Sequence, residues 1–170
     1  MDQDRILYRG EAFTLTGNSL RQDAAHWAEV QPDGQVKTMK NGRYSEWSIV
    51  PEAGNAPHYR GNFEVLNQAY GLALHEAGAL LNEEGTFRTG ANWPTVWTRD
   101  ISYSTHLGLG LWNVRACMNS LNARVRNGEV EQDTGTGGSW PISSDRVVWG
   151  MAAWEVYCLT GDADWLSLSC

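Results

Sequence analysis

The hydrophobic pattern of the chain changes its period near residue 57, and this change constrains the fold more than any other feature. Before it, short runs alternate apolar and polar residues between turn signals: QPDGQ (31–35) joins HWAEV to VKTM, and Asn41-Gly42 follows. After it, apolar residues from Phe63 to Leu81 recur at helical spacing. The pattern predicts a short β-rich segment over residues 1–57 and helices over residues 58–170.

Five helices are expected in the second part, which makes the expected fold mainly α. They are predicted over residues 62–82, from Asp100 to Leu111, from Asn113 to Val125, from Ser143 to Thr160, and from Asp162 onward. Helices joined in this way are typical of antiparallel hairpin pairs, the unit of helical arrays and toroids. The last helix has barely begun where the chain ends, so we expect a truncated sequence.

The chain is acidic, with 13 basic and 20 acidic side chains and a formal net charge of -7. Binding to nucleic acid needs clustered Lys and Arg, and no such cluster occurs, so nucleic acid is not an expected partner. No apolar run reaches the length of a transmembrane helix. The start, MDQDRILYRG, has no basic region followed by an apolar stretch. Neither a membrane contact nor a signal peptide is therefore expected.

The sequence gives little support for metal or disulfide chemistry. The cysteines Cys117, Cys158 and Cys170 are odd in number and show no CxxC spacing. The four histidines are scattered along the chain without a ligand pattern. No metal and no organic cofactor is expected.

Nine tryptophans are many for a chain of 170 residues. An indole is a large flat apolar surface with one N–H donor, which suits a hydrophobic core, an interface or a platform on which a sugar stacks. Burial statistics favour core packing for most of them. The excess leaves a ligand surface open as an alternative.

The stretch NWPTVWTRD (92–100) is the first candidate site, at a junction between a loop and a helix. Arg99 offers a planar fork of N–H donors, and the carboxylate of Asp100 accepts hydrogen bonds. Together they can hold the vicinal hydroxyl groups of a sugar ring while Trp97 stacks on its apolar face. The alternative is structural, with Asp100 as the cap of its helix and Arg99 in an ion pair.

Two further candidates lie downstream. The glycine-rich loop 132–141 lacks the Lys-Ser/Thr ending of a P-loop. It either brings Asp133 and Trp140 to a cleft or is a plain surface loop. Asp145 and Arg146 open the next helix, where capping is again the alternative. A glycosidase needs two carboxyl groups about 5–9.5 Å apart.

Three blocks in this order resemble bacterial six-hairpin glycosidases: VWTRDISYS (96–104), QDTGTGGSWPISSDRVVW (132–149) and AAWEVYCLTGDADWL (152–166). These are (α/α)6-toroid glycoside hydrolases, often described as α-L-rhamnosidase-like or glycogen-debranching-like. The resemblance implies that residues 1–57 end a β-sandwich-like domain. It also implies that residues 58–170 are the first helical hairpins of an incomplete (α/α)6 toroid. Five helices cannot close a ring of six hairpins, so a fragment is implied.

The resemblance also implies a function, the hydrolysis of O-glycosyl bonds in an oligo- or polysaccharide, with inversion, by a parent protein that is often exported. It implies that substrate is bound by Trp97, Arg99, Asp100, Asp145 and Arg146. Trp140, from the glycine-rich loop, is expected to join them. It leaves the catalytic residues open, with Asp100, Asp133 and Asp145 as candidates, and the chain alone is expected to be inactive. The alternatives are a non-catalytic carbohydrate-binding module and a toroid phosphorylase or polysaccharide lyase.

Overall fold

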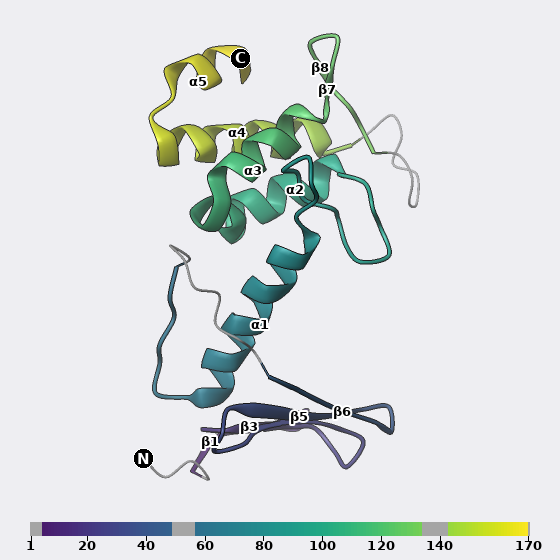
Figure 1. The fold of residues 1–170 in the computed structure, drawn as a ribbon, viewed down its shortest axis with the longest axis vertical. Helices are drawn as coiled ribbons and strands as arrows, with labels where there is room; N and C mark the ends of the chain where they lie inside the picture. The colour runs from purple at the N-terminus through teal and green to yellow at the C-terminus, as the bar shows by residue number, and fades with distance from the viewer. Residues whose placement is uncertain (1–4, 49–56, 134–142, 170) are drawn as a thin grey trace. The chain divides into compact units, whose positions relative to one another are not determined.

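A computed structural model describes residues 5–48, 57–133 and 143–169 (Figure 1). The chain forms two compact units, Met1–Glu76 and Ala77–Cys170, and the division falls inside helix α1 (Glu64–Leu80). The first unit is built on a β-sheet and the second on helices. The domain boundary expected at residues 57 and 58 stays a prediction.

The first unit contains a six-stranded antiparallel sheet in which strands adjacent in sequence pair with each other. The strands are β1 (Ile6–Arg9), β2 (Thr14–Thr16), β3 (Ser19–Arg21), β4 (His26–Val30), β5 (Gln35–Lys40) and β6 (Arg43–Ser48). The predicted strand pair on either side of QPDGQ is confirmed as β4 and β5. Between β5 and β6, Asn41 and Gly42 have φ of 52° and 74°. Positive φ at both positions gives the two-residue turn whose twist matches that of the strands.

The register of the sheet distributes its side chains over two faces. His26 lies opposite Lys40 on one face, and Trp27 lies opposite Met39 on the other, because successive side chains of a strand alternate. The guanidinium of Arg21 stacks on the Trp27 ring, 5.1 Å from its centroid. The two faces of the sheet therefore carry different side chains, with His26 and Lys40 on one and Trp27 and Met39 on the other.

Four α-helices that the structure describes between residues 98 and 169 pack around a hydrophobic core. They are α2 (Thr98–Ser104), α3 (Gly110–Asn122), α4 (Asp145–Thr160) and α5 (Ala163–Ser169), with a short π-helix, η1 (Thr105–Leu109), between α2 and α3. Trp149 and Trp165 are buried in this core. Their indole N–H groups donate to the carbonyls of Leu121 and Ala153 at 3.0 and 2.9 Å. Because both donors are satisfied, these two tryptophans are core residues.

The predicted fold is wrong, because the chain is mixed α/β and not an incomplete (α/α)6 toroid of helical hairpins. The turn signals of the first 48 residues produce a whole six-stranded sheet instead of a short β-rich segment. Helical spacing, in turn, reports only that one face of each helix is apolar and does not determine how helices pair. In the structure α2 to α5 pack together on one core cluster.

A small β-hairpin follows α3 where the sequence analysis predicts the end of a helix. The strand β7 (Val125–Arg126) pairs with β8 (Glu129–Val130). Asn127 and Gly128 form the turn with φ of 53° and 77°, as in the β5–β6 hairpin. Interpreting Asn127-Gly128 only as a helix stop therefore misses two strands.

The end of α4 and the start of α5 confirm the sequence analysis. α4 ends at Thr160, and the Gly161 that caps it has a φ of 68°, in the left-handed region that glycine adopts without steric cost. Asp162 caps α5, since its Oδ1 accepts a hydrogen bond from the amide of Trp165 at 2.9 Å.

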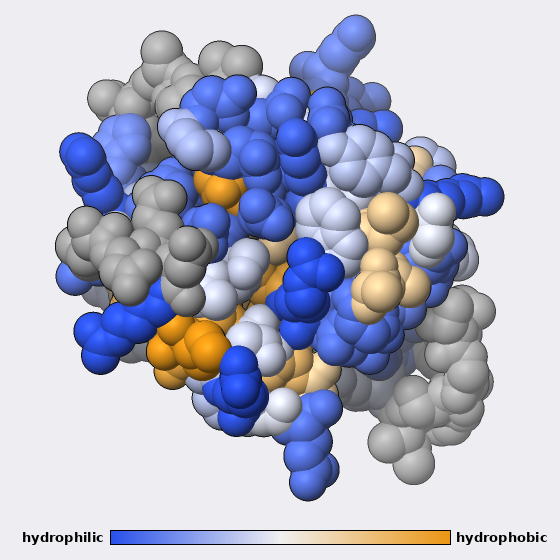
Figure 2. All heavy atoms as spheres, turned by 90° about the horizontal axis from the view of Figure 1, so that it is seen from below, coloured by the Kyte–Doolittle hydropathy of each residue, from blue (hydrophilic) through white to orange (hydrophobic). Residues whose placement is uncertain are grey.

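The molecular surface is mainly hydrophilic on the face that Figure 2 shows, where hydrophobic side chains form small separate patches. Scattered apolar residues on a surface are normal for a folded protein. Within the described ranges, no helix has both the length and the hydropathy that crossing a bilayer requires.

Leu121→Ala is expected to lower the free energy of unfolding of the second unit by about 3 kcal/mol, because Leu121 is 0% exposed and its truncation leaves a cavity. Leu111→Ala, in the same helix but at a position 68% exposed, is expected to change it by less than about 0.5 kcal/mol. Urea unfolding followed by far-UV circular dichroism measures both. Equal losses in the two variants would contradict the assignment of the core.

Cys117 and Cys158 are expected to react with thiol reagents at very different rates. Cys158 is exposed, whereas burial raises the pKa of the Cys117 thiol to about 11, so that little thiolate forms near neutral pH. Iodoacetamide labelling followed by peptide mass spectrometry should modify Cys158 in the folded protein and Cys117 only after urea is added. Rapid labelling of Cys117 without urea would show that the core admits the reagent.

Candidate functional site

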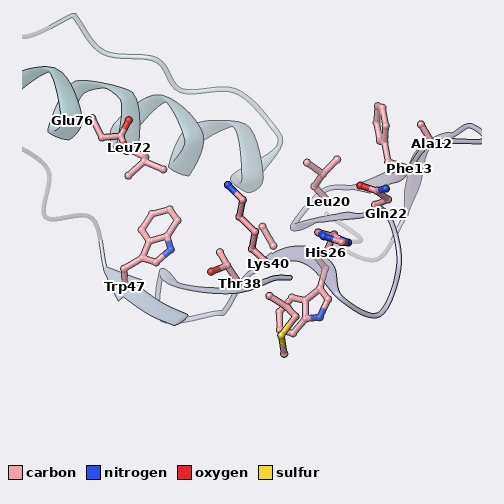
Figure 3. A pocket seen from close by; sticks show the side chains of 13 residues that line it. Ala12, Phe13, Leu20, Gln22, His26, Thr38, Lys40, Trp47, Leu72 and Glu76 are labelled. Atoms are coloured by element: carbon pink, nitrogen blue, oxygen red, sulfur yellow. The ribbon is translucent and has the colours of Figure 1, made fainter. Parts of the chain in front are cut away.

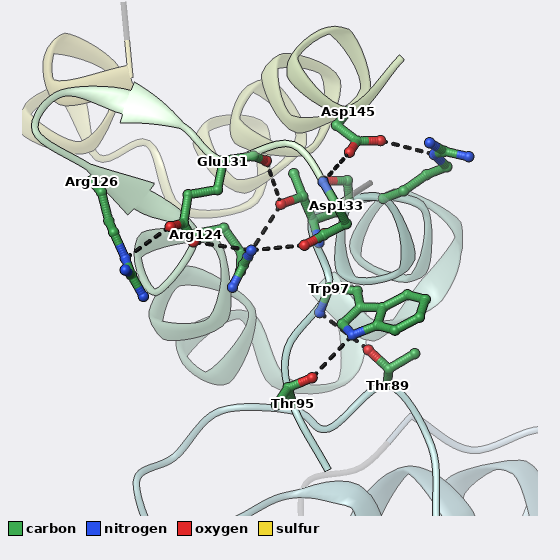
Figure 4. Close-up of polar contacts among 11 residues, drawn as sticks. Thr89, Thr95, Trp97, Arg124, Arg126, Glu131, Asp133 and Asp145 are labelled. Atoms are coloured by element: carbon green, nitrogen blue, oxygen red, sulfur yellow. Dashed lines mark hydrogen bonds and ion pairs between the residues drawn. The ribbon is translucent and has the colours of Figure 1, made fainter. Parts of the chain in front are cut away.

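Two tryptophans form an aromatic corner at the start of α2. Trp97 precedes the helix in an extended conformation, with φ of -110° and ψ of 137°. Its amide donates to Oγ1 of Thr89 at 3.1 Å, and its indole N–H donates to Oγ1 of Thr95 at 3.0 Å (Figure 4). The Trp93 ring meets the Trp97 ring edge to face at a centroid distance of 5.1 Å, and Trp93 is 52% exposed. This pair, Trp93 and Trp97, is called the aromatic corner below.

The N-terminus of α2 is capped by Asp133, which lies 35 residues further along the chain. The Asp133 Oδ2 atom accepts a hydrogen bond from the amide of Thr98, the first residue of α2. Its Oδ1 atom accepts one from Nη2 of Arg124 at 2.7 Å. A carboxylate at this position satisfies a free amide and meets the positive end of the helix dipole. Asp133 therefore stabilises the start of α2.

Asp145, the first residue of α4, connects the starts of α2 and α4. It is 0% exposed. Its Oδ1 accepts a hydrogen bond from Nε of Arg99 at 2.9 Å, and its Oδ2 accepts one from the amide of Asp133 at 2.7 Å (Figure 4). Arg99, Asp133 and Asp145 are called the Asp145 cluster below. The ion pair that the sequence analysis offers as the structural alternative for Arg99 is thus present.

Asp145 remains ionised at neutral pH despite its burial. Burial by itself would raise the pKa of this carboxyl, but hydrogen bonds from Ser143 and from the Asp133 amide, together with Arg99, outweigh it and leave the pKa below its ordinary value. The same ion pair raises the pKa of the Arg99 guanidinium above its ordinary value. The pair is therefore fully charged at neutral pH.

Asp100 differs from these two carboxylates because it is exposed on α2. Partial desolvation raises the pKa of the Asp100 carboxyl, and the charges of Asp133 and Asp145 add to this effect, while its own amide and Arg99 oppose it. The structure thus brings the three acidic candidates of the sequence analysis together at the starts of α2 and α4. Of the three, Asp100 is the one whose pKa is raised above its ordinary value.

The Asp145 cluster continues into the β7–β8 hairpin through residues that the sequence analysis misses. The Nη2 atom of Arg124 is 3.0 Å from Oε2 of Glu131, and its Nε donates to Oγ1 of Thr98 at 3.2 Å. Glu131 also pairs with Arg126 at 2.8 Å (Figure 4). A usable signal existed, because charged residues occupy alternate positions on both sides of the Asn127-Gly128 turn. A hairpin brings such positions opposite one another.

Arg146, another predicted substrate-binding residue, does not join the Asp145 cluster. Arg146 is exposed and contacts β8, since its Nε donates to the carbonyl of Val130 at 3.3 Å and its Nη2 is 3.4 Å from Glu129. Trp140 lies outside the described residues. In the part of the chain that the structure describes, no group of three or more His, Cys, Asp or Glu side chains is arranged to hold a metal ion.

Comparison of the chain with protein-family models, with curated proteins and with solved structures finds no match. The resemblance of the three sequence blocks to six-hairpin glycosidases therefore stays a prediction.

Asp145→Asn is expected to lower the free energy of unfolding of the second unit by about 2 kcal/mol at neutral pH, because a neutral amide cannot form the charge-assisted hydrogen bond to Arg99. The pKa of Asp145 is lower in the folded than in the unfolded chain. Its contribution is therefore present above the unfolded pKa and is lost as the pH falls through the folded pKa. Urea unfolding should show the difference between wild type and variant shrinking below about pH 4.

Glu129→Gln is the matched control, because it removes a carboxylate from an exposed pair with Arg146 in the same unit. Its expected cost is less than about 0.5 kcal/mol. A loss in Asp145→Asn that is independent of pH, or no larger than the loss in this control, would contradict the role assigned to Asp145.

Proposed function

We propose that the second unit binds a carbohydrate at the start of α2, through Trp93, Trp97, Arg99 and Asp100, and that this binding serves the hydrolysis of a glycosidic bond. The observation that supports the proposal most is the aromatic corner next to an arginine whose orientation is set by a buried carboxylate. A sugar ring has an apolar C–H face and an edge of hydroxyl groups. It therefore needs a stacking surface with donors and acceptors beside it.

Arg99 is oriented for this role by Asp145. Its Nε donates to Asp145 at 2.9 Å, and within the described ranges its two terminal nitrogens have no hydrogen-bond partner. The Arg99 side chain is 42% exposed, so its terminal N–H groups are accessible to the hydroxyl groups of a ligand. The neighbouring Asp100 carboxylate adds an exposed acceptor.

Hydrolysis of a glycosidic bond needs two carboxyl groups with different roles. Asp100 suits the proton donor because its pKa is raised. Asp133 and Asp145 suit the second role less well, since every oxygen of their carboxylates already accepts a hydrogen bond from a protein group. This observation favours a second candidate function, carbohydrate binding without hydrolysis by this chain.

Trp97→Ala is expected to weaken binding of an oligosaccharide at least about tenfold, because a central aromatic contact carries much of the binding energy of such a surface. A glycan array identifies the oligosaccharide, and isothermal titration calorimetry measures its affinity. Trp154→Ala removes another tryptophan, 56% exposed on α4, and is expected to leave the affinity unchanged. Equal effects of the two substitutions would contradict a binding surface at the aromatic corner.

Release of nitrophenol from aryl glycosides separates the two candidate functions. Binding without hydrolysis predicts no release by this chain. If the wild-type chain does release nitrophenol, the Asp100→Asn variant is measured next. Loss of the release, with the affinity for the oligosaccharide retained, would assign the proton donor to Asp100. The absence of both binding on the array and hydrolysis would refute the proposed function.

A further inference from the structure

A pocket with a volume of about 770 Å³ lies within the first unit, between one face of the sheet and α1 (Figure 3). Pockets that bind small molecules typically enclose about 300–1,000 Å³ and are mostly apolar with a few polar groups. The volume of this pocket therefore suits a small molecule.

The walls of the pocket are mainly apolar. Leu20 and Trp47 line it from the sheet, Phe13 lines it from the segment before β2, and Leu72 lines it from α1 (Figure 3). Leu20 lies opposite Ala28 in the register of β3 and β4, which places both on the face of the sheet that borders the pocket. A ligand here would bury apolar surface on two sides, which is the main driving force for such binding.

Lys40 brings a positive charge into this apolar space. Figure 3 shows its ammonium group pointing from β5 toward α1, among the side chains that line the pocket. In the described part of the chain Lys40 forms no ion pair, whereas Lys37 of the same strand lies 3.9 Å from Glu46. Because the two lysines are an odd number of residues apart, they lie on opposite faces of the sheet.

The other titratable groups that line the pocket are His26 and Glu76. The His26 ring is already engaged on both sides, since Nδ1 is 3.0 Å from Asp23 Oδ1 and Nε2 is 2.8 Å from Asn41 Oδ1. These two hydrogen bonds raise the pKa of His26, and the one to Asn41 is the larger cause. A raised pKa favours the protonated ring, which is a second cation beside Lys40. Glu76 lies near Leu72 on α1 (Figure 3). Lys40 is thus the cation that a ligand can reach.

We propose that this pocket binds an apolar small molecule that carries a single anionic group, such as a medium-chain carboxylate. Its chain lies against Leu20, Trp47 and Leu72, and its carboxylate accepts a charge-assisted hydrogen bond from Lys40. The pocket shares no residue with the carbohydrate surface at the start of α2. A negative result for one of the two proposals therefore leaves the other unaffected.

Isothermal titration calorimetry with decanoate, below its micellar concentration, tests the proposal on the whole chain. One saturable site is expected. Lys40→Met should weaken decanoate binding at least about fivefold, because the ligand carboxylate loses its charged partner. Lys37→Met, on the opposite face of the same strand, should leave the affinity unchanged. Far-UV circular dichroism confirms that both variants keep the sheet.

A charge exchange makes the test more specific. Lys40→Glu should reject decanoate and bind decylammonium, which has the same chain and the opposite charge. The wild type should show the reverse preference. This exchange separates a pocket that recognises the anionic group from apolar adsorption, which would not depend on the sign of the charge.

Three results would overturn the proposal: no saturable binding of decanoate, equal weakening by Lys37→Met and Lys40→Met, or a Lys40→Glu variant that still prefers decanoate. None of these results bears on oligosaccharide binding by Trp97.

Discussion

The second unit depends on the ionised carboxylate of Asp145, which is fully buried at the start of α4. A buried charge is costly unless it is paired and hydrogen-bonded. Asp145 meets both conditions only when Arg99 of α2 and the amide of Asp133 are in place. Asp133, in turn, reaches its position while capping α2 and pairing with Arg124. The need to compensate one charge therefore fixes the starts of two helices and the end of the hairpin segment relative to one another.

The sequence predicts the local elements of this protein better than their assembly. The β4–β5 hairpin, the end of α4 before Gly161 and the cap of α5 by Asp162 follow from residues close together in the chain, so turn and capping rules suffice. The toroid is wrong because helical periodicity is a property of one helix at a time, whereas the pairing of helices depends on contacts between distant residues. For the same reason the sequence finds Asp133 but not its function as the cap of Thr98, 35 positions away.

The candidate site shows a similar division. Residue types at helix starts and in the glycine-rich loop predict a site that includes Trp97, Arg99, Asp100, Asp133 and Asp145. The structure places these residues around the starts of α2 and α4. The division of roles among the acids could not be predicted, since it depends on which carboxylate oxygens are already occupied. Asp133 and Asp145 are held by protein donors and stabilise the fold, whereas Asp100 is exposed and its pKa is raised. The carboxylates that stabilise the fold are therefore distinct from Asp100, the one to which the proposed ligand chemistry is assigned.

The hydrogen bond between the Asp133 amide and the Asp145 carboxylate joins positions 12 residues apart at a distance of 2.7 Å. It fixes both ends of the intervening stretch within the helical framework. The entropy cost of closing a loop grows slowly, by about 0.6 kcal/mol for each doubling of its length. An insertion that doubled the spacing between Asp133 and Asp145 would therefore add only about 0.6 kcal/mol to the cost of closing the segment between them. The hydrogen bond thus separates the geometry of the two helix starts from the length of the chain that joins them.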